Sequence, residues 1–127
     1  QITTIMKNRL ITPQLTEVFS KYPLYSQDEK GKNAICICTF QIGNIHWYIT
    51  EGNVEEHDCT MFGVVTGLYE TEYGYISLNE LEKIELDASQ YGLGKLKVVQ
   101  NPAIQNIRLA EINDPLLQQF LEGLECV

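Results

Sequence analysis

The sequence has no long hydrophobic run and few basic residues. No apolar stretch approaches the ~20 residues that cross a bilayer, and no short apolar stretch with a small-residue cleavage site opens the chain. We therefore expect no membrane contact and a cytoplasmic protein. Nine Lys and Arg stand against 17 Asp and Glu, for a net charge of −8. Because nucleic-acid affinity depends on basic side chains that displace counterions, we expect no direct nucleic-acid binding and favour a protein partner, with charge complementarity pointing to a basic one.

The common catalytic and metal-binding motifs are also missing. There is no G-x-S-x-G, no P-loop and no complete G-x-G-x-x-G, so we expect no cofactor and an enzyme is disfavoured. Cys36 and Cys38 have C-x-C spacing rather than the C-x-x-C of zinc or thioredoxin-like redox sites. Without a secretory context, the four cysteines are expected to be free thiols, mostly buried. In a strand, Cys36 and Cys38 would share a face with Phe40.

The patterns that are present predict an α+β fold in a single domain, residues 1–127. A β-meander core over residues 34–69 is expected from three β-rich runs: Ala34–Ile42, Ile45–Glu51 and Thr60 to about Tyr69. The pair Gly43-Asn44 suits a tight hairpin turn between the first two runs. A fourth strand over Lys95–Gln100 completes an antiparallel sheet of about four strands.

Two helices are expected on the N-terminal and central parts of the chain. Thr12 as N-cap and Pro13 in the first turn begin an N-terminal helix. Ser77 and Glu80 form a capping box, in which the serine hydroxyl and the glutamate carboxylate both accept backbone N–H groups. This box predicts a short helix near 77–85.

A third helix is expected near 114–124, within a C-terminal helical extension over 112–127. It begins at Asp114 and carries a leucine-rich stripe. The stripe either packs against the sheet or mediates self-association, so a monomer and a homodimer both remain open. At the other end, residues 1–5 precede Met6, a natural start, and are expected to be disordered or foreign to the native chain.

Four strings in one order carry a family resemblance. Met61–Leu68 reads MFGVVTGL and is similar to F-F-G-[LY]-V-x-G, and Glu72–Leu81 reads EYGYISLNEL and is similar to E-L-G-Y-F-S-L-x-E-L. His46–Gly52 contains a W-Y-[VA]-T-E segment as WYITE, and Tyr22–Tyr25 is similar to the end of L-P-x-L-Y. Over roughly residues 11–85 the chain thus resembles the uncharacterised bacterial family called domain of unknown function 2958.

The resemblance implies a small cytoplasmic accessory protein carried by a mobile genetic element such as a plasmid or phage. It carries no established mechanism, cofactor or partner. The family continues with I-E-R-D-x-x-F, whereas this chain has KLKVV at Lys95–Val99. A role tied to the Arg-Asp pair is therefore not expected here.

One polar cluster offers a candidate metal or catalytic site. Imidazole and carboxylate groups are suitable ligands for a divalent metal, and the candidate ligands are His46, His57 and Asp58. A small hydrolase or metal-dependent enzyme would use His46, Glu51 and His57. The alternative is a solvated acidic loop, because Glu55–Asp58 lacks the helical spacing of H-E-x-x-H.

The aromatic residues suggest a different kind of site. Trp47 and Tyr48 alternate across a strand, so one faces the core and the other the opposite side. If helices cover only one face of the sheet, the other face would display aromatic side chains beside acidic ones, as in protein-binding hot spots. The candidate binding residues are Trp47, Tyr48, Glu51, Tyr73 and Tyr75. The alternative is that these are ordinary core residues.

These observations favour a non-enzymatic protein-binding module. Ten of the 17 acidic residues fall between Glu51 and Asp87. In a sharper version of the hypothesis, this segment imitates nucleic-acid charge and inhibits a host DNA-processing or defence protein by occupying its basic site.

Overall fold

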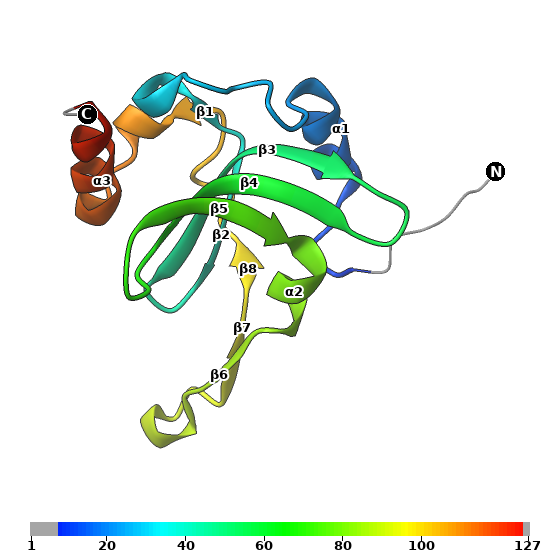
Figure 1. Ribbon diagram of the computed structural model, residues 1–127. Coiled ribbons are helices and arrows are strands. Elements are labelled where there is room, and N and C mark those ends of the chain that lie inside the picture. Colours follow the sequence, from blue (N-terminus) through cyan, green and yellow to red (C-terminus); the bar gives the residue numbers. More distant parts are fainter. Residues whose placement is uncertain (1–7, 126–127) are drawn as a thin grey trace.

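A five-stranded antiparallel sheet forms the centre of the structure, a computed structural model that describes residues 8–125 (Figure 1). Its spatial order is β5-β4-β3-β2-β8. The strands are β2 (Cys38–Ile42), β3 (Ile45–Val54), β4 (Cys59–Thr66), β5 (Glu72–Ser77) and β8 (Val99–Gln100). With the helices described below, this sheet confirms the α+β class. Residues 1–5, expected to be disordered or foreign to the native chain, lie outside the described residues. So does Cys126, one of the four cysteines expected to be free thiols.

The predicted meander is confirmed in β2, β3 and β4. Gly43 has a φ of +57°, and Ile42 pairs with Ile45 across the turn, as a two-residue hairpin requires. The second strand runs to Val54 rather than ending at Glu51. The chain before Ile42 is divided into β1 (Ile35–Cys36) and β2, with Ile37 between them.

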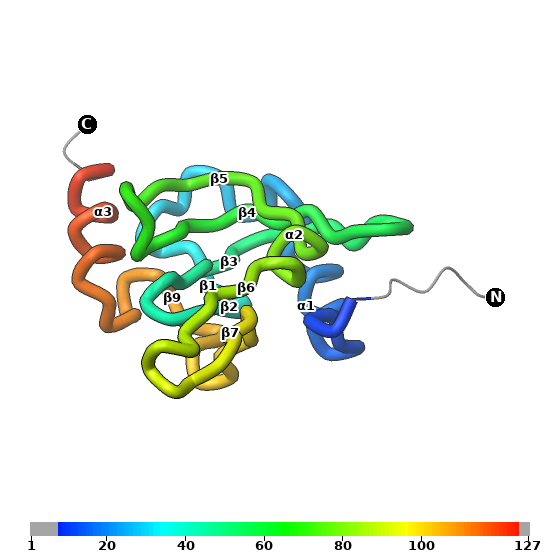
Figure 2. Tube along the Cα trace, turned by 90° about the horizontal axis from the view of Figure 1, so that it is seen from below, coloured from blue at the N-terminus to red at the C-terminus, as the bar shows by residue number. Residues whose placement is uncertain are grey.

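Two predictions about the outer strands need correction. β5 was not expected as a strand, because Gly74 lowers the β-propensity in the middle of a short run. The run Lys95–Gln100 was expected as one strand but is divided at Val98. β7 (Lys95–Lys97) pairs with β6 (Glu85–Asp87), whereas β8 pairs with β2. With the short helix η2 (Ser89–Tyr91) at its tip, the β6–β7 hairpin projects from the body as an arm (Figures 1 and 2).

Both faces of the sheet are covered by helices. On one face, α1 (Pro13–Lys21) and α2 (Leu78–Lys83) enclose a first core that includes Phe19, Phe40, Trp47, Ile49, Met61 and Leu78. On the other face, α3 (Pro115–Glu125) encloses a second core that includes Cys36, Tyr48, Val64, Leu109, Leu117 and Leu121. The 3-10 helix η3 (Leu109–Glu111) and the ladder of β1 with β9 (Ile107–Arg108) complete this side, near η1 (Gly31–Asn33). α1 and α3 lie at opposite ends of the sheet (Figure 2).

The expected helix starts are confirmed. The Thr12 hydroxyl accepts a hydrogen bond from the Leu15 N–H, and the Ser77 hydroxyl accepts one from the Glu80 N–H. The carboxylate that completes the start of α2 belongs to Asp58, however, which accepts hydrogen bonds from the Ser77 hydroxyl and from the backbone N–H of Asn79. Sequence spacing could not identify Asp58, because it comes from the β3–β4 turn.

The C-terminal helix packs against the chain's own sheet, as the first of the two alternatives predicted. Leu117 and Leu121 are its buried residues in the second core. No helix within residues 8–125 has the length and apolar character needed to span a membrane.

The three described cysteines, Cys36, Cys38 and Cys59, are free and buried, as expected. The expectation that Cys36 and Cys38 share a face is wrong. Cys36 belongs to the second core and Cys38 to the first. Ile37 interrupts the strand between them and donates its N–H to the carbonyl of Ile49. This irregularity inserts one extra residue into the alternation of side chains between the two faces of the sheet. The side chains of Cys36 and Cys38 therefore lie on opposite faces.

Candidate functional site

A β-bulge in β3 decides where Glu51 points. Ile49 pairs with Gly63, and the next pair along the strands is Glu51 with Phe62, so Thr50 is the extra residue. Strict alternation would have placed Glu51 on the face of Ile49, in the first core. The bulge instead turns Glu51 to the second face, next to Phe62. Bulges commonly re-aim a side chain in this way.

The Glu51 carboxylate connects the sheet to the loop after α1. It is only 3% exposed. Its Oε1 accepts a hydrogen bond from the Tyr25 N–H and its Oε2 one from the Gln27 N–H, each 2.8 Å long. The Gln27 side chain is buried as well and donates to the carbonyl oxygens of Ile35 and Thr50. Loop residues 25–27 are therefore fixed over the end of β3 by hydrogen bonds on buried side chains.

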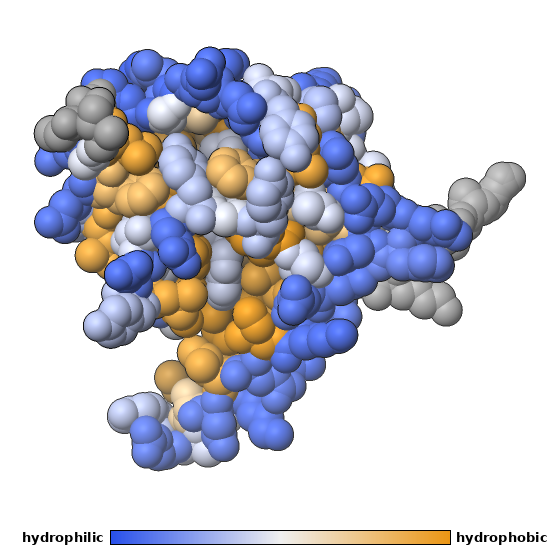
Figure 3. Space-filling model, viewed as in Figure 1, coloured by the Kyte–Doolittle hydropathy of each residue, from blue (hydrophilic) through white to orange (hydrophobic). Residues whose placement is uncertain are grey.

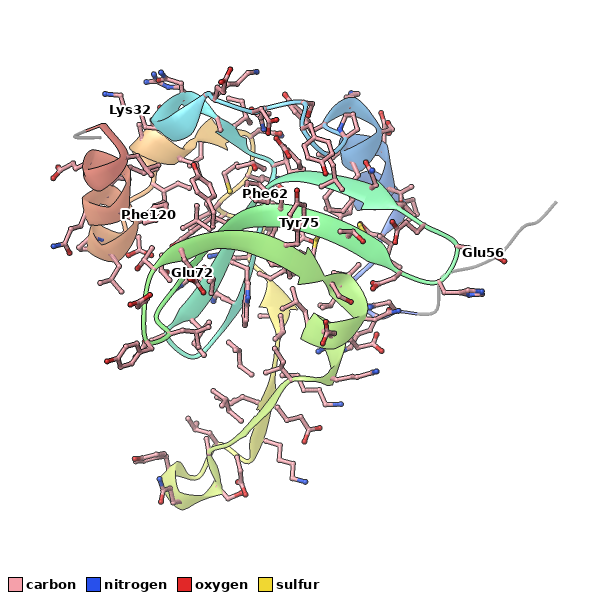
Figure 4. The ribbon with its side chains drawn as sticks, in the orientation of Figure 1. Lys32, Glu56, Phe62, Glu72, Tyr75 and Phe120 are labelled. Carbon is pink, nitrogen blue, oxygen red and sulfur yellow. The ribbon has the colours of Figure 1, made fainter. Side chains whose placement is uncertain are left out.

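Aromatic rings cover the second face beside Glu51. Phe62 and Tyr73 are stacked, with ring centroids 5.2 Å apart and planes 13° from parallel. Phe120 of α3 meets Tyr73 edge-on at 5.2 Å. Tyr75 lies against Phe62 at 5.2 Å and donates a 3.3 Å hydrogen bond from its hydroxyl to that of Tyr25. Figure 4 shows Phe62 and Tyr75 side by side over the sheet, with Phe120 approaching from α3.

These groups border a cleft of about 300 Å³ between the loop, the sheet and the end of α3. Its lining residues are Gln27, Asp28, Glu29, Gly31, Ala34, Thr50, Glu51, Phe62, Tyr73 and Leu124. The lining contains three acidic residues and no lysine or arginine. Lys30 on the same loop and Lys32 in η1 are not part of the lining. The cleft therefore combines aromatic surface with negative charge.

The pKa values of two tyrosines at the cleft, Tyr73 and Tyr75, are raised. Burial, followed by the nearby carboxylate of Glu51, raises the pKa of Tyr73. For the exposed Tyr75, the hydrogen bond with Tyr25 is the main cause of a raised pKa, and Asp28 and Glu51 add to it. Both phenols accordingly stay neutral at physiological pH.

The residues proposed for a metal or hydrolytic site are not brought together. His46 lies near the start of β3, and His57 lies in the turn after its end. The eight residue-to-residue steps of strand from His46 to Val54 correspond to about 26 Å. Asp58 is occupied by the hydrogen bonds at the start of α2; these bonds outweigh the effect of burial and lower its pKa. Within residues 8–125 no group of three or more His, Cys, Asp or Glu is arranged to hold a metal ion.

The turn around His57 instead matches the alternative of a solvated acidic loop. Glu55, Glu56 and His57 are all exposed. The His57 Nε2 lies 3.6 Å from the Glu56 carboxylate, and both side chains are mostly in solvent. An exposed pair of this kind contributes little to stability.

The described thiols are also unsuited to catalysis. Burial raises the pKa of Cys36 to about 11 and that of Cys59 to about 12, and raises the pKa of Cys38 well above its ordinary value. Since the thiolate is the nucleophile, these three cysteines are inert at neutral pH.

The five residues predicted for partner binding divide between core and cleft. Trp47 and Tyr48 are 6% and 2% exposed and lie in the first and second core, respectively, because both faces of the sheet are covered. Glu51 and Tyr73 line the cleft, and Tyr75 is 59% exposed beside it. The structure thus brings three of the five together at the cleft, where Glu51 is buried in its wall, and encloses the other two in the cores.

Sequence reasoning missed Tyr25, Phe62 and Phe120 at this site. Phe62 could have been found once the register of β3 and β4 was known, because it pairs with Glu51. Tyr25 and Phe120 reach the sheet from a loop and from a helix distant in sequence, and no local pattern indicates either contact. Comparisons of the chain with protein-family models, with curated proteins and with solved structures find no match.

Proposed function

We propose that the protein is a non-enzymatic binding module whose cleft receives a basic side chain of a partner protein. The observation that carries this proposal is the cleft itself, where the stacked rings of Phe62 and Tyr73 adjoin the carboxylates of Glu51, Asp28 and Glu29. The resemblance to the mobile-element family supports an accessory role exercised through protein contacts in the bacterial cytoplasm.

The chemistry of the cleft favours a guanidinium group over a neutral ligand. Aromatic faces attract cations, and arginine both stacks on aromatic rings and donates hydrogen bonds to carboxylates. Glu51 is held in place by two backbone N–H groups, so its charge is fixed in position. Asp28 and Glu29 are exposed and can meet an incoming cation without a large desolvation cost.

A pair of short peptides tests this proposal. Acetyl-Gly-Arg-Gly-amide and its citrulline analogue differ in charge but scarcely in shape. We expect the arginine peptide to shift the NMR signals of the Tyr73 and Phe62 rings in a saturable manner and the citrulline peptide to leave them unchanged. Equal responses to both peptides would show that charge recognition in the cleft is absent.

Two double variants separate the cleft from the overall charge. Asp28→Asn combined with Glu29→Gln removes the exposed carboxylates of the cleft and is expected to weaken arginine-peptide binding about tenfold. Glu55→Gln combined with Glu56→Gln removes the same charge from the β3–β4 turn, where both side chains are exposed, and is expected to leave binding unchanged. Equal losses of arginine-peptide binding in the two double variants would show that the peptide is attracted by the overall negative charge of the protein and not by the cleft.

A further inference from the structure

The outer edge of β5 is regular and open. β5 is the terminal strand of the central sheet, and six consecutive residues pair with β4 without a shift in register. The opposite edge is formed by β8, which has two residues. Within the described part of the chain, no hydrogen bond from another segment reaches the outer backbone of β5. Its outward N–H and C=O groups are therefore available to an additional strand.

β5 also lacks the features that usually protect an edge. Proteins discourage edge pairing with lysine, proline, bulges or very short strands. The sequence EYGYIS contains no lysine and no proline, and its one charged residue is Glu72. Such an edge invites pairing with another chain.

Gly74 gives a second, independent indication. It has no positive φ, and a Cβ atom added there would meet no atom of the described residues within 4 Å. The opposite glycine, Gly63, is different, because its Cβ would lie 2.0 Å from the Tyr48 carbonyl oxygen. The fold thus requires glycine at 63 but not at 74. A glycine inside a strand that neither backbone conformation nor neighbouring atoms require often marks the close approach of another backbone.

The charge around this edge selects the kind of strand that can pair with it. No lysine or arginine occurs between residues 33 and 82, which includes the whole of β2 to β5. Glu70, Glu72 and Glu80 are exposed on or next to β5. Pairing of β5 with its copy in a second molecule would bring two acidic edges together, on chains with a net charge of −8 each. A basic strand gains attraction at the same place.

We propose that an extended, basic segment of a partner protein pairs with β5 as a sixth strand of the sheet. This inference rests on the proposed function, binding of a basic protein partner, and specifies how that partner docks. Side chains of an added strand alternate between the two faces. Those on one face extend the cross-strand row of Glu51, Phe62 and Tyr75 and can place a cation on the exposed Tyr75 ring. Those on the other face come next to Glu72.

The surface that such a strand would border is visible in the space-filling view. The middle of the sheet, over β4 and β5, is pale rather than strongly hydrophilic, and bluer side chains frame it toward the loop above and the β3–β4 turn (Figure 3). The docked segment would therefore combine backbone pairing at the edge with aromatic contact on the face.

The test uses a nine-residue peptide of alternating arginine and valine, together with the same peptide N-methylated at its three central amides. N-methylation keeps the charge and the side chains but blocks backbone pairing. We expect the unmodified peptide to bind and to slow hydrogen exchange of alternate β5 amides about tenfold, and the methylated peptide to bind about tenfold more weakly. Equal binding of the two peptides, or unchanged exchange in β5, would overturn the inference.

Two single variants of the full chain provide a matched control. Glu72→Lys places a lysine on the edge strand and is expected to weaken binding of the unmodified peptide about tenfold. The lysine repels the arginines of the peptide, and a lysine on an edge strand disfavours pairing with a further strand. Glu80→Lys makes the same charge change on α2, at another exposed position, and is expected to have at most about a threefold effect. Equal effects of the two variants would contradict strand pairing at β5.

The outcomes also distinguish this inference from the proposed function. If the nine-residue peptide leaves β5 exchange unchanged while the acetyl-Gly-Arg-Gly-amide response in the cleft persists, strand pairing is refuted and the binding module stands. If neither peptide binds, both fail.

Discussion

The Tyr48 hydroxyl donates a 2.7 Å hydrogen bond to the Asp114 carboxylate and thereby joins the middle of the sheet to the start of α3. The same carboxylate oxygen accepts a 2.9 Å bond from the Thr66 hydroxyl. The other oxygen caps the helix by accepting the N–H groups of Leu116 and Leu117. One aspartate thus caps the start of α3 and accepts hydrogen bonds from hydroxyls on two neighbouring strands, so it links the helix to the sheet.

Tyr48→Phe should lower the free energy of unfolding by about 2 kcal/mol at pH 7. The substitution removes a hydrogen bond to a charged group at a site that is 2% exposed, and such bonds typically contribute about 1.5–3 kcal/mol. Urea denaturation measures the loss. Tyr69→Phe is the matched control, because Tyr69 is fully exposed, and it should change stability by less than about 0.5 kcal/mol.

The same pair predicts a pH dependence. Burial of Asp114 opposes ionisation, but the hydrogen bonds from Tyr48 and Thr66 prevail and lower its pKa. A lowered carboxyl pKa stabilises the fold above its ordinary value of about 3.9, and this stabilisation is lost as the pH falls through the lowered value. The difference in unfolding free energy between pH 7 and pH 3 should therefore be smaller in Tyr48→Phe than in the unchanged chain. An equal difference would mean that the bond does not depend on the ionisation of Asp114.

The fold was predictable where local chemistry determines it. Gly43-Asn44 fixed the hairpin and Thr12 and Ser77 the helix starts, because turns and caps depend on neighbouring residues. The two bulge-like irregularities, at Ile37 and at Thr50, were not predictable. Each adds one residue to a strand and so shifts the alternation of side chains between the two faces. For this reason the shared face expected for Cys36 and Cys38 was wrong, and the face of Glu51 could not be read from strand periodicity.

The site was predictable only in part, because its composition depends on register and on distant segments. Glu51, Tyr73 and Tyr75 come together through the pairing of β3, β4 and β5. One of the pair Trp47 and Tyr48 was expected at the surface if one face of the sheet stayed uncovered. Whether a C-terminal helix covers a given face is decided by tertiary packing, on which strand periodicity carries no information.

Glu51→Gln should release the loop that borders the cleft. An amide has one acceptor oxygen, and its NH2 group cannot accept a hydrogen bond, so the N–H of either Tyr25 or Gln27 loses its partner. We expect a loss of about 1–3 kcal/mol in unfolding free energy and faster hydrogen exchange at these two amides. Glu55→Gln, on the exposed turn, should change neither quantity. Unchanged exchange in Glu51→Gln would show that the loop is held by other contacts.

The described thiols should be unreactive in the native protein. Cys36, Cys38 and Cys59 are buried, and burial raises the pKa of each. Cys126→Ser removes the fourth cysteine, so that only these three thiols can react. In this variant, Ellman's reagent at pH 8 should leave the three thiols unmodified in the native protein and modify all of them in denaturant. Rapid modification of any one of them in the native state would indicate that its core opens readily.

Gly63→Ala and Gly74→Ala should have opposite effects although the two glycines pair directly across β4 and β5. A Cβ at 63 would lie 2.0 Å from the Tyr48 carbonyl oxygen and 2.9 Å from the Ile49 Cα, both backbone atoms at the bulge that cannot move without disturbing β3. We expect a loss of about 3 kcal/mol or more in unfolding free energy, measured by urea denaturation. At 74 the space is open, so alanine should be neutral or stabilising by about 0.5 kcal/mol. Similar losses at both positions would contradict the close approach of β3 to β4 that turns Glu51 toward the cleft.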